Sequence, residues 1–234
     1  MLYLNNIKKE FDKNNIVLDG INVTFKEGSI NCIVGRNGAG KTTLLNLMSS
    51  ILMPTSGEIS YLGNNINQFT ENRKNIFYVA VSPFFYEKLS AKQNLKLICA
   101  LYEKTISKEN INIVIEKVGL ESKDLKKPVY NYSSGMKQKL SFAAMLLVSS
   151  PVILLDEPFN ALDTKTQMNF LGILKDLADE NHTIIFTSHL INTMFKLAEY
   201  MYVLNEGKIT EYHSTTLFDD EEQLEEWINQ TIYT

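Results

Sequence analysis

A glycine-rich loop between an apolar segment and a helical one is the most constraining feature of this sequence. Gly35 and Gly40 precede a lysine and two threonines, in the run GRNGAGKTT at residues 35–43. Residues 29–34 (SINCIV) predict a buried strand, and residues 44–48 (LLNLM) predict a helix. A strand, a glycine loop and a helix in this order are typical of a phosphate-binding site. An ordinary glycine-rich turn is the alternative.

The residue types in the loop suit the binding of a triphosphate. Backbone N–H groups can surround phosphate oxygens only where the chain bends tightly with no side chains in the way, which Gly35, Gly38 and Gly40 allow. Lys41 would bring its ammonium to the outer phosphates, and the hydroxyl of Thr42 would bind Mg²⁺. The free N–H groups of the following helix would face the same anion.

The composition predicts a folded chain in a reducing compartment. The 234 residues are 44% hydrophobic and include 5 prolines, which favours a sizeable core over disorder. A formal net charge of -4 argues against a nucleic-acid partner. Cys32 and Cys99 show neither metal-ligand spacing nor a disulfide framework, and neither a signal peptide nor a run of 18 apolar residues occurs. We therefore expect a soluble cytosolic protein, at most peripheral to a membrane.

The residues before the glycine loop predict a β-rich entry to the fold. Residues 2–7 and 21–25 alternate as strands do, with a polar turn at residues 12–15 between them. Phe11 stands at the edge of this turn, where an aromatic ring could stack on a nucleotide base. On residue chemistry alone, a phenylalanine packed in the core is the favoured alternative.

A helical insert interrupts the strands in the middle of the chain. Residues 58–62 and 76–81 predict strands, but residues from about 84 to 134 show little strand signal. Within this part, residues 91–102 and 109–118 predict amphipathic helices. We expect this segment to form a helical subdomain.

The predicted organisation is a single domain of residues 1–234, with the helical subdomain at about 84–134 and an amphipathic C-terminal helix at about 216–232. The insert begins with the aromatic run FFY at residues 84–86, which is more aromatic surface than a small core normally needs. We hypothesise that some of these rings line a groove for a short helix of a partner protein. The alternative is that all of them pack the insert.

Two acids and a histidine follow predicted strands in the second half of the chain. Residues 151–155 (PVILL) lead into Asp156 and Glu157, and residues 183–187 (TIIFT) come shortly before His189. Because the carboxyl ends of parallel strands open onto the ligand crevice, both acids would emerge beside the glycine loop. A surface turn for the acids and a solvated loop for the histidine are the alternatives.

Together these motifs resemble the nucleotide-binding subunit of an ATP-binding-cassette (ABC) transporter, over nearly the whole chain. The glycine loop is similar to the family's Walker A loop, residues 152–158 (VILLDEP) to Walker B, and His189 to the switch histidine. Residues 133–135 (SSG) fall at the family signature, residues 160–163 (NALD) at the dimer-contact loop, and Phe11 at the adenine-stacking position. The resemblance implies an α/β fold, a P-loop NTPase of ABC type, with a mixed central sheet, a β-rich entry subdomain and a helical insert.

The resemblance also implies ATP and Mg²⁺ as cofactors, and a role for each residue of the site. Asp156 and Thr42 would serve Mg²⁺, and Glu157 would polarise the attacking water. Lys41 and His189 would contact the phosphates during hydrolysis. The nucleotide-binding positions would be Phe11, Gly35, Arg36, Asn37, Gly38, Ala39, Gly40, Lys41, Thr42, Thr43, Ser133 and Gly135.

In this family two subunits close head to tail over two ATP molecules, and the signature of each completes the site of the other. Ser133 and Gly135 would open a helix predicted over residues 134–148, which makes that helix start a second anion site. The resemblance implies a homodimer, or a heterodimer with another ABC subunit, that drives transport by ATP-dependent closure. It would lie at the cytoplasmic side of the membrane, peripheral and bound to a separate transmembrane permease.

Two motifs depart from the family pattern. The signature is YSSGM at residues 132–136 where the family usually has LSGGQ, a form that resembles exporter-type cassettes. Val81 stands where the family has a glutamine that contacts Mg²⁺ and the attacking water. We expect the ATPase subunit of an exporter for a peptide, toxin, drug or lipid. The alternatives are a soluble ABC-type ATPase in translation or repair, and a regulatory ATP binder with slow turnover.

Overall fold

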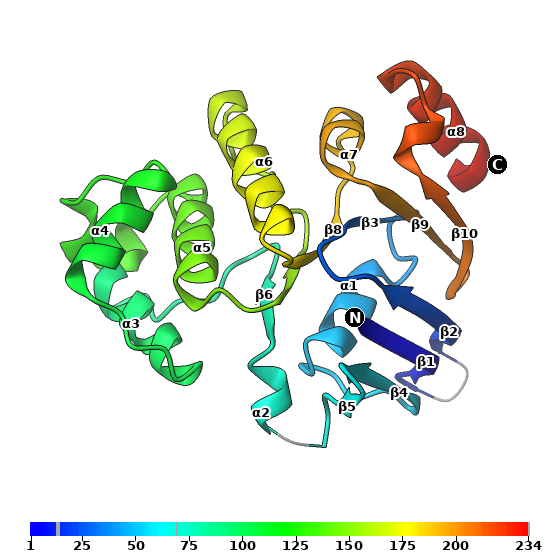
Figure 1. Ribbon diagram of the computed structural model, residues 1–234, viewed down its shortest axis with the longest axis horizontal. Helices are drawn as coiled ribbons and strands as arrows, with labels where there is room; N and C mark the ends of the chain where they lie inside the picture. The colour runs from blue at the N-terminus through cyan, green and yellow to red at the C-terminus, as the bar shows by residue number, and fades with distance from the viewer. Residues whose placement is uncertain (13–14, 69, 234) are drawn as a thin grey trace.

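The computed structural model describes residues 1–12, 15–68 and 70–233, so residues 13 and 14 of the predicted polar turn lie outside it. Two sheets form the centre of the fold (Figure 1). One is a 4-stranded antiparallel sheet of order β2-β1-β4-β5, which is the predicted β-rich entry. Its strands are β1 (Leu2–Glu10), β2 (Ile16–Phe25), β4 (Ser56–Tyr61) and β5 (Asn64–Asn65).

The second sheet is 6-stranded and mixed, with order β10-β9-β3-β8-β7-β6. Its strands are β3 (Ile30–Val34), β6 (Ile76–Val79), β7 (Val152–Leu155), β8 (Thr183–Thr187), β9 (Tyr200–Asn205) and β10 (Lys208–Ser214). Every residue of β3, β7 and β8 is buried, as expected for parallel strands covered on both faces. Only β10 pairs antiparallel within the described part of this sheet. The carboxyl ends of β3, β7 and β8 therefore meet at one edge.

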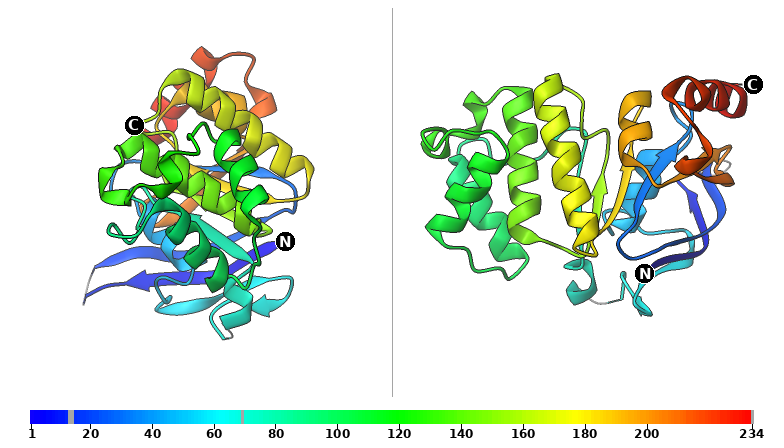
Figure 2. Two further views of the ribbon diagram at one scale, coloured as in Figure 1. Left: turned by 90° about the vertical axis from the view of Figure 1, so that its left-hand side faces the viewer. Right: turned by 45° about the horizontal axis from the view of Figure 1, so that its top comes forward.

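Eight α-helices are described: α1 (Lys41–Met48), α2 (Thr70–Arg73), α3 (Ala91–Leu101), α4 (Lys108–Lys117), α5 (Ser134–Val148), α6 (Thr164–Asp179), α7 (Ile191–Leu197) and α8 (Glu221–Tyr233). Helices α3 and α4 pack on α5 and form one end of the molecule, while β1, β2, β10 and α8 lie at the other (Figures 1 and 2). Hydroxyl groups of Ser90, Ser107 and Ser133 cap α3, α4 and α5.

Two hydrophobic cores lie on the two faces of the mixed sheet. One joins the sheet to the helices, and Phe142 of α5 stacks there on Phe170 of α6 with ring centroids 3.9 Å apart. The other lies between the two sheets around α1, where Phe25 and Tyr202 meet edge to face at 5.0 Å. The strand ends that carry the predicted site are thus held between two packed layers.

The structure corrects several predicted boundaries. β1 extends to Glu10 and β2 begins at Ile16, because irregularities in their ladder break the alternation on which the prediction rested. Helix α7 is an additional element whose first residue follows Leu190 with no side-chain cap. The last helix starts later than predicted, at Glu221, since Thr215–Leu217 form a separate 3₁₀ turn. Helix α5, in contrast, has the bounds predicted for it, residues 134–148, and it packs with α3 and α4.

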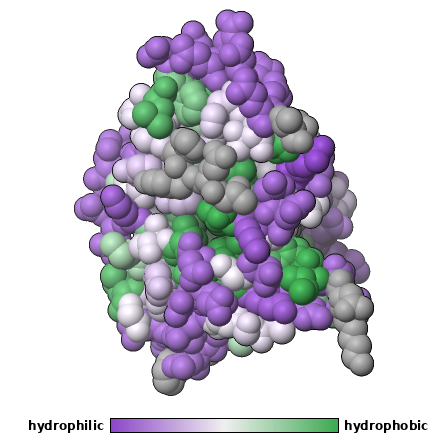
Figure 3. Space-filling view, turned by 90° about the vertical axis from the view of Figure 1, so that its right-hand side faces the viewer, coloured by the Kyte–Doolittle hydropathy of each residue, from purple (hydrophilic) through white to green (hydrophobic). Residues whose placement is uncertain are grey.

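The tail helix α8 buries one face. Leu224, Ile228 and Ile232 are buried, as expected for an amphipathic helix. The side of the molecule on which α8 and β10 lie is mostly hydrophilic, with smaller apolar areas (Figure 3). Among the helices described, none combines the length and the apolar character that crossing a membrane requires.

Candidate functional site

The glycine loop joins the carboxyl end of β3 to the amino end of α1. A Cβ atom at Gly35 would collide with the carbonyl oxygen of Leu204, so this position has no room for a side chain. Gly40 has a φ of 105°, a left-handed conformation, and α1 begins after it without a side-chain cap. The N–H groups of the first helical turn therefore remain available to an anion.

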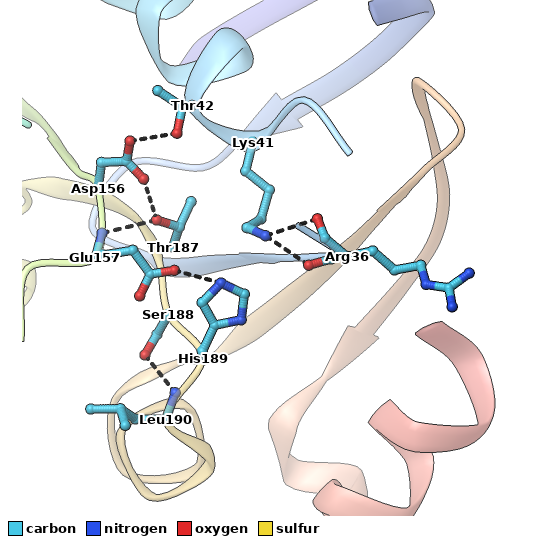
Figure 4. A network of polar contacts seen from close by, with 10 residues as sticks. Arg36, Lys41, Thr42, Asp156, Glu157, Thr187, Ser188, His189 and Leu190 are labelled. Carbon is cyan, nitrogen blue, oxygen red and sulfur yellow. Dashed lines mark hydrogen bonds and ion pairs between the residues drawn. The ribbon is translucent and has the colours of Figure 1, made fainter. Parts of the chain in front are cut away.

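The ammonium of Lys41 lies over this loop. Its Nζ donates to the carbonyl oxygens of Gly35 at 2.7 Å and of Arg36 at 3.2 Å (Figure 4). Burial lowers the pKa of Lys41, while the carboxylates of Glu157 and Asp156 act in the opposite direction. A lysine held by two backbone oxygens in a largely buried place is positioned to exchange them for phosphate oxygens.

Asp156, at the end of β7, is the centre of a buried hydroxyl cluster. Its carboxylate is 2% exposed and accepts hydrogen bonds from Oγ1 of Thr42 and Oγ1 of Thr187, each at 2.7 Å. The hydroxyl of Tyr78 lies 3.4 Å from Oδ2 of the same carboxylate. Burial, with the charge of Asp156 next, raises the pKa of Tyr78, so the phenol keeps its proton and acts as a donor.

The donor set at Asp156 fits Mg²⁺. The hydroxyl of Thr42 and the carboxylate of Asp156 are hard oxygen donors in contact with each other. Within the described ranges, no cluster of three acidic, histidine or cysteine side chains could hold a metal by itself. Mg²⁺ characteristically binds one or two protein oxygens and completes its coordination shell with phosphate oxygens and water. Thr42 and Asp156 supply the two protein oxygens and leave the other coordination positions to phosphates and water.

Glu157 and His189 face each other beyond the ends of β7 and β8 (Figure 4). Oε1 of Glu157 lies 3.0 Å from Nε2 of His189, a contact that becomes an ion pair when the imidazole is protonated. This oxygen is buried, and Nε2 of His189 is its polar neighbour among the described residues. Burial raises the pKa of Glu157, although His189 and Lys41 oppose the shift. A carboxylate with a raised pKa that lines the cavity suits a general base.

The backbone at Glu157 is unusual. Its φ is 48°, in the left-handed region, which costs a residue with a Cβ about 1 to 2 kcal/mol. The backbone N–H donates to Oγ1 of Thr187 at 3.0 Å, and the hydroxyl of Thr187 donates in turn to Asp156. Thr187 therefore holds both acids, and the turn aims the side chain of Glu157 at His189.

These groups line one cavity of about 390 Å³. Its lining residues are Val17, Asn37, Gly38, Gly40, Lys41, Thr42, Thr43, Val81, Asp156, Glu157 and His189. Gly35, Arg36 and Ala39 belong to the loop but do not line the cavity, and the side chain of Arg36 points away from Glu157 and His189 (Figure 4). Val17 is an apolar wall from β2 that the sequence analysis missed, because no motif marks it.

The family is decided by comparison with known proteins. A profile described as ABC transporter matches residues 18–160. The chain belongs to the ABC transporter family. This cassette is 32% identical to the lantibiotic transport ATP-binding protein SrtF of Streptococcus pyogenes, over 99% of this chain and 97% of SrtF. It is 37% identical to the bacitracin transport ATP-binding protein BcrA of Bacillus licheniformis, over 83% of this chain and 63% of BcrA.

A solved structure confirms the fold. The cassette matches the dimeric ATP-binding cassette MJ0796, solved in a post-hydrolysis state bound to ADP and Pi, with a TM-score of 0.84. The two chains are 26% identical, and the match covers 92% of this chain and 99% of that one. The predicted P-loop NTPase fold of ABC type is therefore confirmed, and the chain is the ATP-binding component of a transporter family.

Besides the three loop residues that do not line the cavity, three predicted residues outside the loop lie apart from it. Ser133 and Gly135 do not line it; instead, Oγ of Ser133 accepts a hydrogen bond from the backbone N–H of Met136 at 3.2 Å and caps α5. Phe11 does not line it either, and its ring lies under Nζ of Lys9, 4.9 Å from the centroid. Because Phe11 is 49% exposed, the alternative that it packs in the core is wrong.

A second hollow of about 490 Å³ lies between β6 and the helical end of the molecule. The aromatic run at residues 84–86 lines it together with residues of α3 and α5. Phe84 is 81% and Tyr86 is 54% exposed, whereas Phe85 is buried. The alternative that all three rings pack the insert is therefore wrong. We call this hollow the aromatic groove.

Proposed function

We propose that this cassette binds and hydrolyses ATP and drives a membrane exporter through ATP-dependent closure of a dimer. The observation that carries the proposal is the convergence of the phosphate loop, the end of β7 and the residues after β8 on one cavity. SrtF and BcrA are named as lantibiotic and bacitracin transport proteins, which supports export and a peptide-like substrate. The soluble ATPase of translation or repair has no observation in its favour.

The role of each residue follows from its position. The ammonium of Lys41 exchanges the two loop carbonyl oxygens for phosphate oxygens. The first N–H groups of α1 donate to the same phosphates. Thr42 and Asp156 hold Mg²⁺, which neutralises phosphate charge when bound. Glu157, which lines the cavity, orients a water molecule and accepts its proton. His189 fixes Glu157 and reaches the phosphoryl group from the exposed side of the cavity.

The proposed hydrolytic site needs a second cassette. Ser133 and Gly135 lie outside the cavity of their own chain, at an exposed helix start. A head-to-tail pair would bring this helix start to the partner's phosphates, and the dimeric state of MJ0796 supports such a pair. A homodimer and a pair with a sister cassette satisfy this requirement equally.

The aromatic groove is the proposed contact with a separate transmembrane permease. The rings of Phe84 and Tyr86 are largely exposed to solvent, so they are not needed to fill the core. The two rings meet edge to face with their centroids 5.6 Å apart. Exposed apolar surface of this kind suits the apolar face of a short helix. The cassette would then lie at the cytoplasmic side of the membrane as a peripheral subunit.

Substitution of Glu157 by Gln tests the proposal. Glutamine keeps the shape of the side chain and loses the basic oxygen, so hydrolysis should fall at least a hundredfold while ATP still binds. Size-exclusion chromatography with ATP and Mg²⁺ should then show a stable dimer. The exposed Glu116→Gln serves as the matched control and should behave like the parent. Loss of ATP binding in Glu157→Gln would contradict the role of this glutamate.

A regulatory binder with slow turnover is the second candidate function. Val81, which is 49% exposed, lines the cavity and offers no polar atom to a metal or a water. The turnover number of the parent protein decides between the two functions, because a regulatory binder would close on ATP and hydrolyse almost none.

A further inference from the structure

The carboxylate of Asp156 has a neighbour that the roles proposed above leave unused. Thr187 holds Oδ1 at 2.7 Å, and Thr42 donates to Oδ2 at 2.7 Å. The hydroxyl of Tyr78 also points at Oδ2, at a longer 3.4 Å. Tyr78 thus brings a third hydroxyl to the carboxylate, from a strand that carries no other predicted site residue.

The position of Tyr78 in β6 gives this contact its significance. β6 pairs in parallel with β7, and Tyr78 lies beside Leu154, two residues before Asp156. The same strand leads directly into Val81, where this chain lacks the polar side chain of its family. Through Tyr78, β6 therefore contacts Asp156, one of the two proposed metal ligands. The loop after β6 contributes only the apolar side chain of Val81 to the cavity.

We propose that Tyr78 is a positioning residue that holds the carboxylate of Asp156 in the orientation that binds Mg²⁺. The inference rests on the proposed function, because it assigns Asp156 to the metal. Thr42 is itself a proposed metal ligand, so its hydroxyl serves both the metal and Asp156. Tyr78 is not a proposed metal ligand, so its hydroxyl can restrain the carboxylate of Asp156 without also binding the metal. At 3.4 Å the contact of Tyr78 is longer than those of the two threonines, so its restraint on the carboxylate is the weakest of the three.

A purely structural role for Tyr78 is the competing explanation. Its ring lines the aromatic groove and packs against the core between the two sheets. Substitution by Phe separates the two roles, because it keeps the ring and removes the oxygen. A packing role would survive this change, whereas a positioning role would not.

The experiment measures metal binding directly, with Mn²⁺ as the probe for the Mg²⁺ site. Mn²⁺ affinity of the ATP-loaded protein is measured by electron paramagnetic resonance for the parent and for Tyr78→Phe, alongside ATP affinity without metal. We expect Mn²⁺ affinity to fall about fivefold in Tyr78→Phe, and metal-free ATP affinity to stay unchanged.

Tyr102→Phe is the matched control. Tyr102 lines the same groove, but its hydroxyl donates to the backbone carbonyl of Ile76 at 3.1 Å, away from Asp156. This variant should bind Mn²⁺ like the parent. If Tyr78→Phe also binds Mn²⁺ like the parent, or if Tyr102→Phe weakens binding equally, the inference is overturned while the proposed function stands. A parent protein that fails to bind ATP at all overturns both.

Discussion

Two helices of this cassette begin at proposed phosphate sites, and they begin in different ways. α1 follows Gly40, has no side-chain cap, and starts with the largely buried Lys41. α5 follows Ser133, which is exposed and whose own hydroxyl caps the helix. The first helix start is therefore ready for an anion in a single chain. At the second, the hydroxyl of Ser133 already accepts from the N–H of Met136, and this N–H becomes available to a phosphate from another chain only when the cap is released.

The largest expected effect comes from closing the α1 site with a single methyl group. Gly35→Ala places a Cβ against the carbonyl oxygen of Leu204, so the loop must move away from the geometry that surrounds phosphates. ATP affinity should fall more than a hundredfold, as measured with a fluorescent nucleotide.

Gly172→Ala is the control for this change, because a Cβ there meets nothing within 4 Å and the residue lies in α6. Thermal unfolding of both variants, followed by circular dichroism, separates loss of the site from loss of the fold. A folded Gly35→Ala protein with normal ATP affinity would mean that the α1 site is not a preformed phosphate site.

A smaller effect is expected at the α5 start. Ser133→Ala removes a cap worth about 1 kcal/mol and the hydroxyl proposed to reach the partner's nucleotide. ATP binding by the monomer should be unchanged, while ATP-dependent dimerisation in the Glu157→Gln background should weaken about tenfold by analytical ultracentrifugation.

Ser107→Ala removes an equivalent cap from α4, where Oγ of Ser107 accepts from the N–H of Asn110 at 3.0 Å. It should cost similar stability and leave dimerisation intact. Equal effects of the two serine variants on dimerisation would show that the α5 start acts only as a helix cap, and the contrast between the two helices would disappear.

The smallest expected effect concerns the wall that faces the α1 site. Val81→Gln restores a polar side chain to the cavity and should raise ATP turnover a few fold, since tenfold corresponds to about 1.4 kcal/mol of transition-state stabilisation. Ser82→Ala tests whether the next residue already supplies the oxygen, in which case turnover should drop. Steady-state phosphate release measures both. A fast parent that neither substitution alters would remove this loop from the chemistry.

The features that could be predicted are those determined by a short, continuous segment of the sequence. The strand and loop at residues 29–43 and the acids after residue 155 were predicted correctly, because burial on both faces and a motif of fixed spacing mark them. Val17 and Tyr78 could not be predicted. Val17 reaches the cavity only because β2 lies against Gly40, and Tyr78 meets Asp156 only through the register of β6 on β7. Such contacts arise from tertiary packing.

At Glu157, the side chain that suits the proposed chemistry is not the side chain that best suits the left-handed backbone. Glycine or asparagine adopts a φ of 48° with less strain than glutamate does. The fold would therefore gain stability from exactly those side chains that cannot activate water. A screen of random variants for heat resistance alone should accumulate glycine or asparagine at position 157 and lose the proposed general base. Retention of glutamate under this selection would mean that the left-handed turn at position 157 costs the fold too little stability to be selected against.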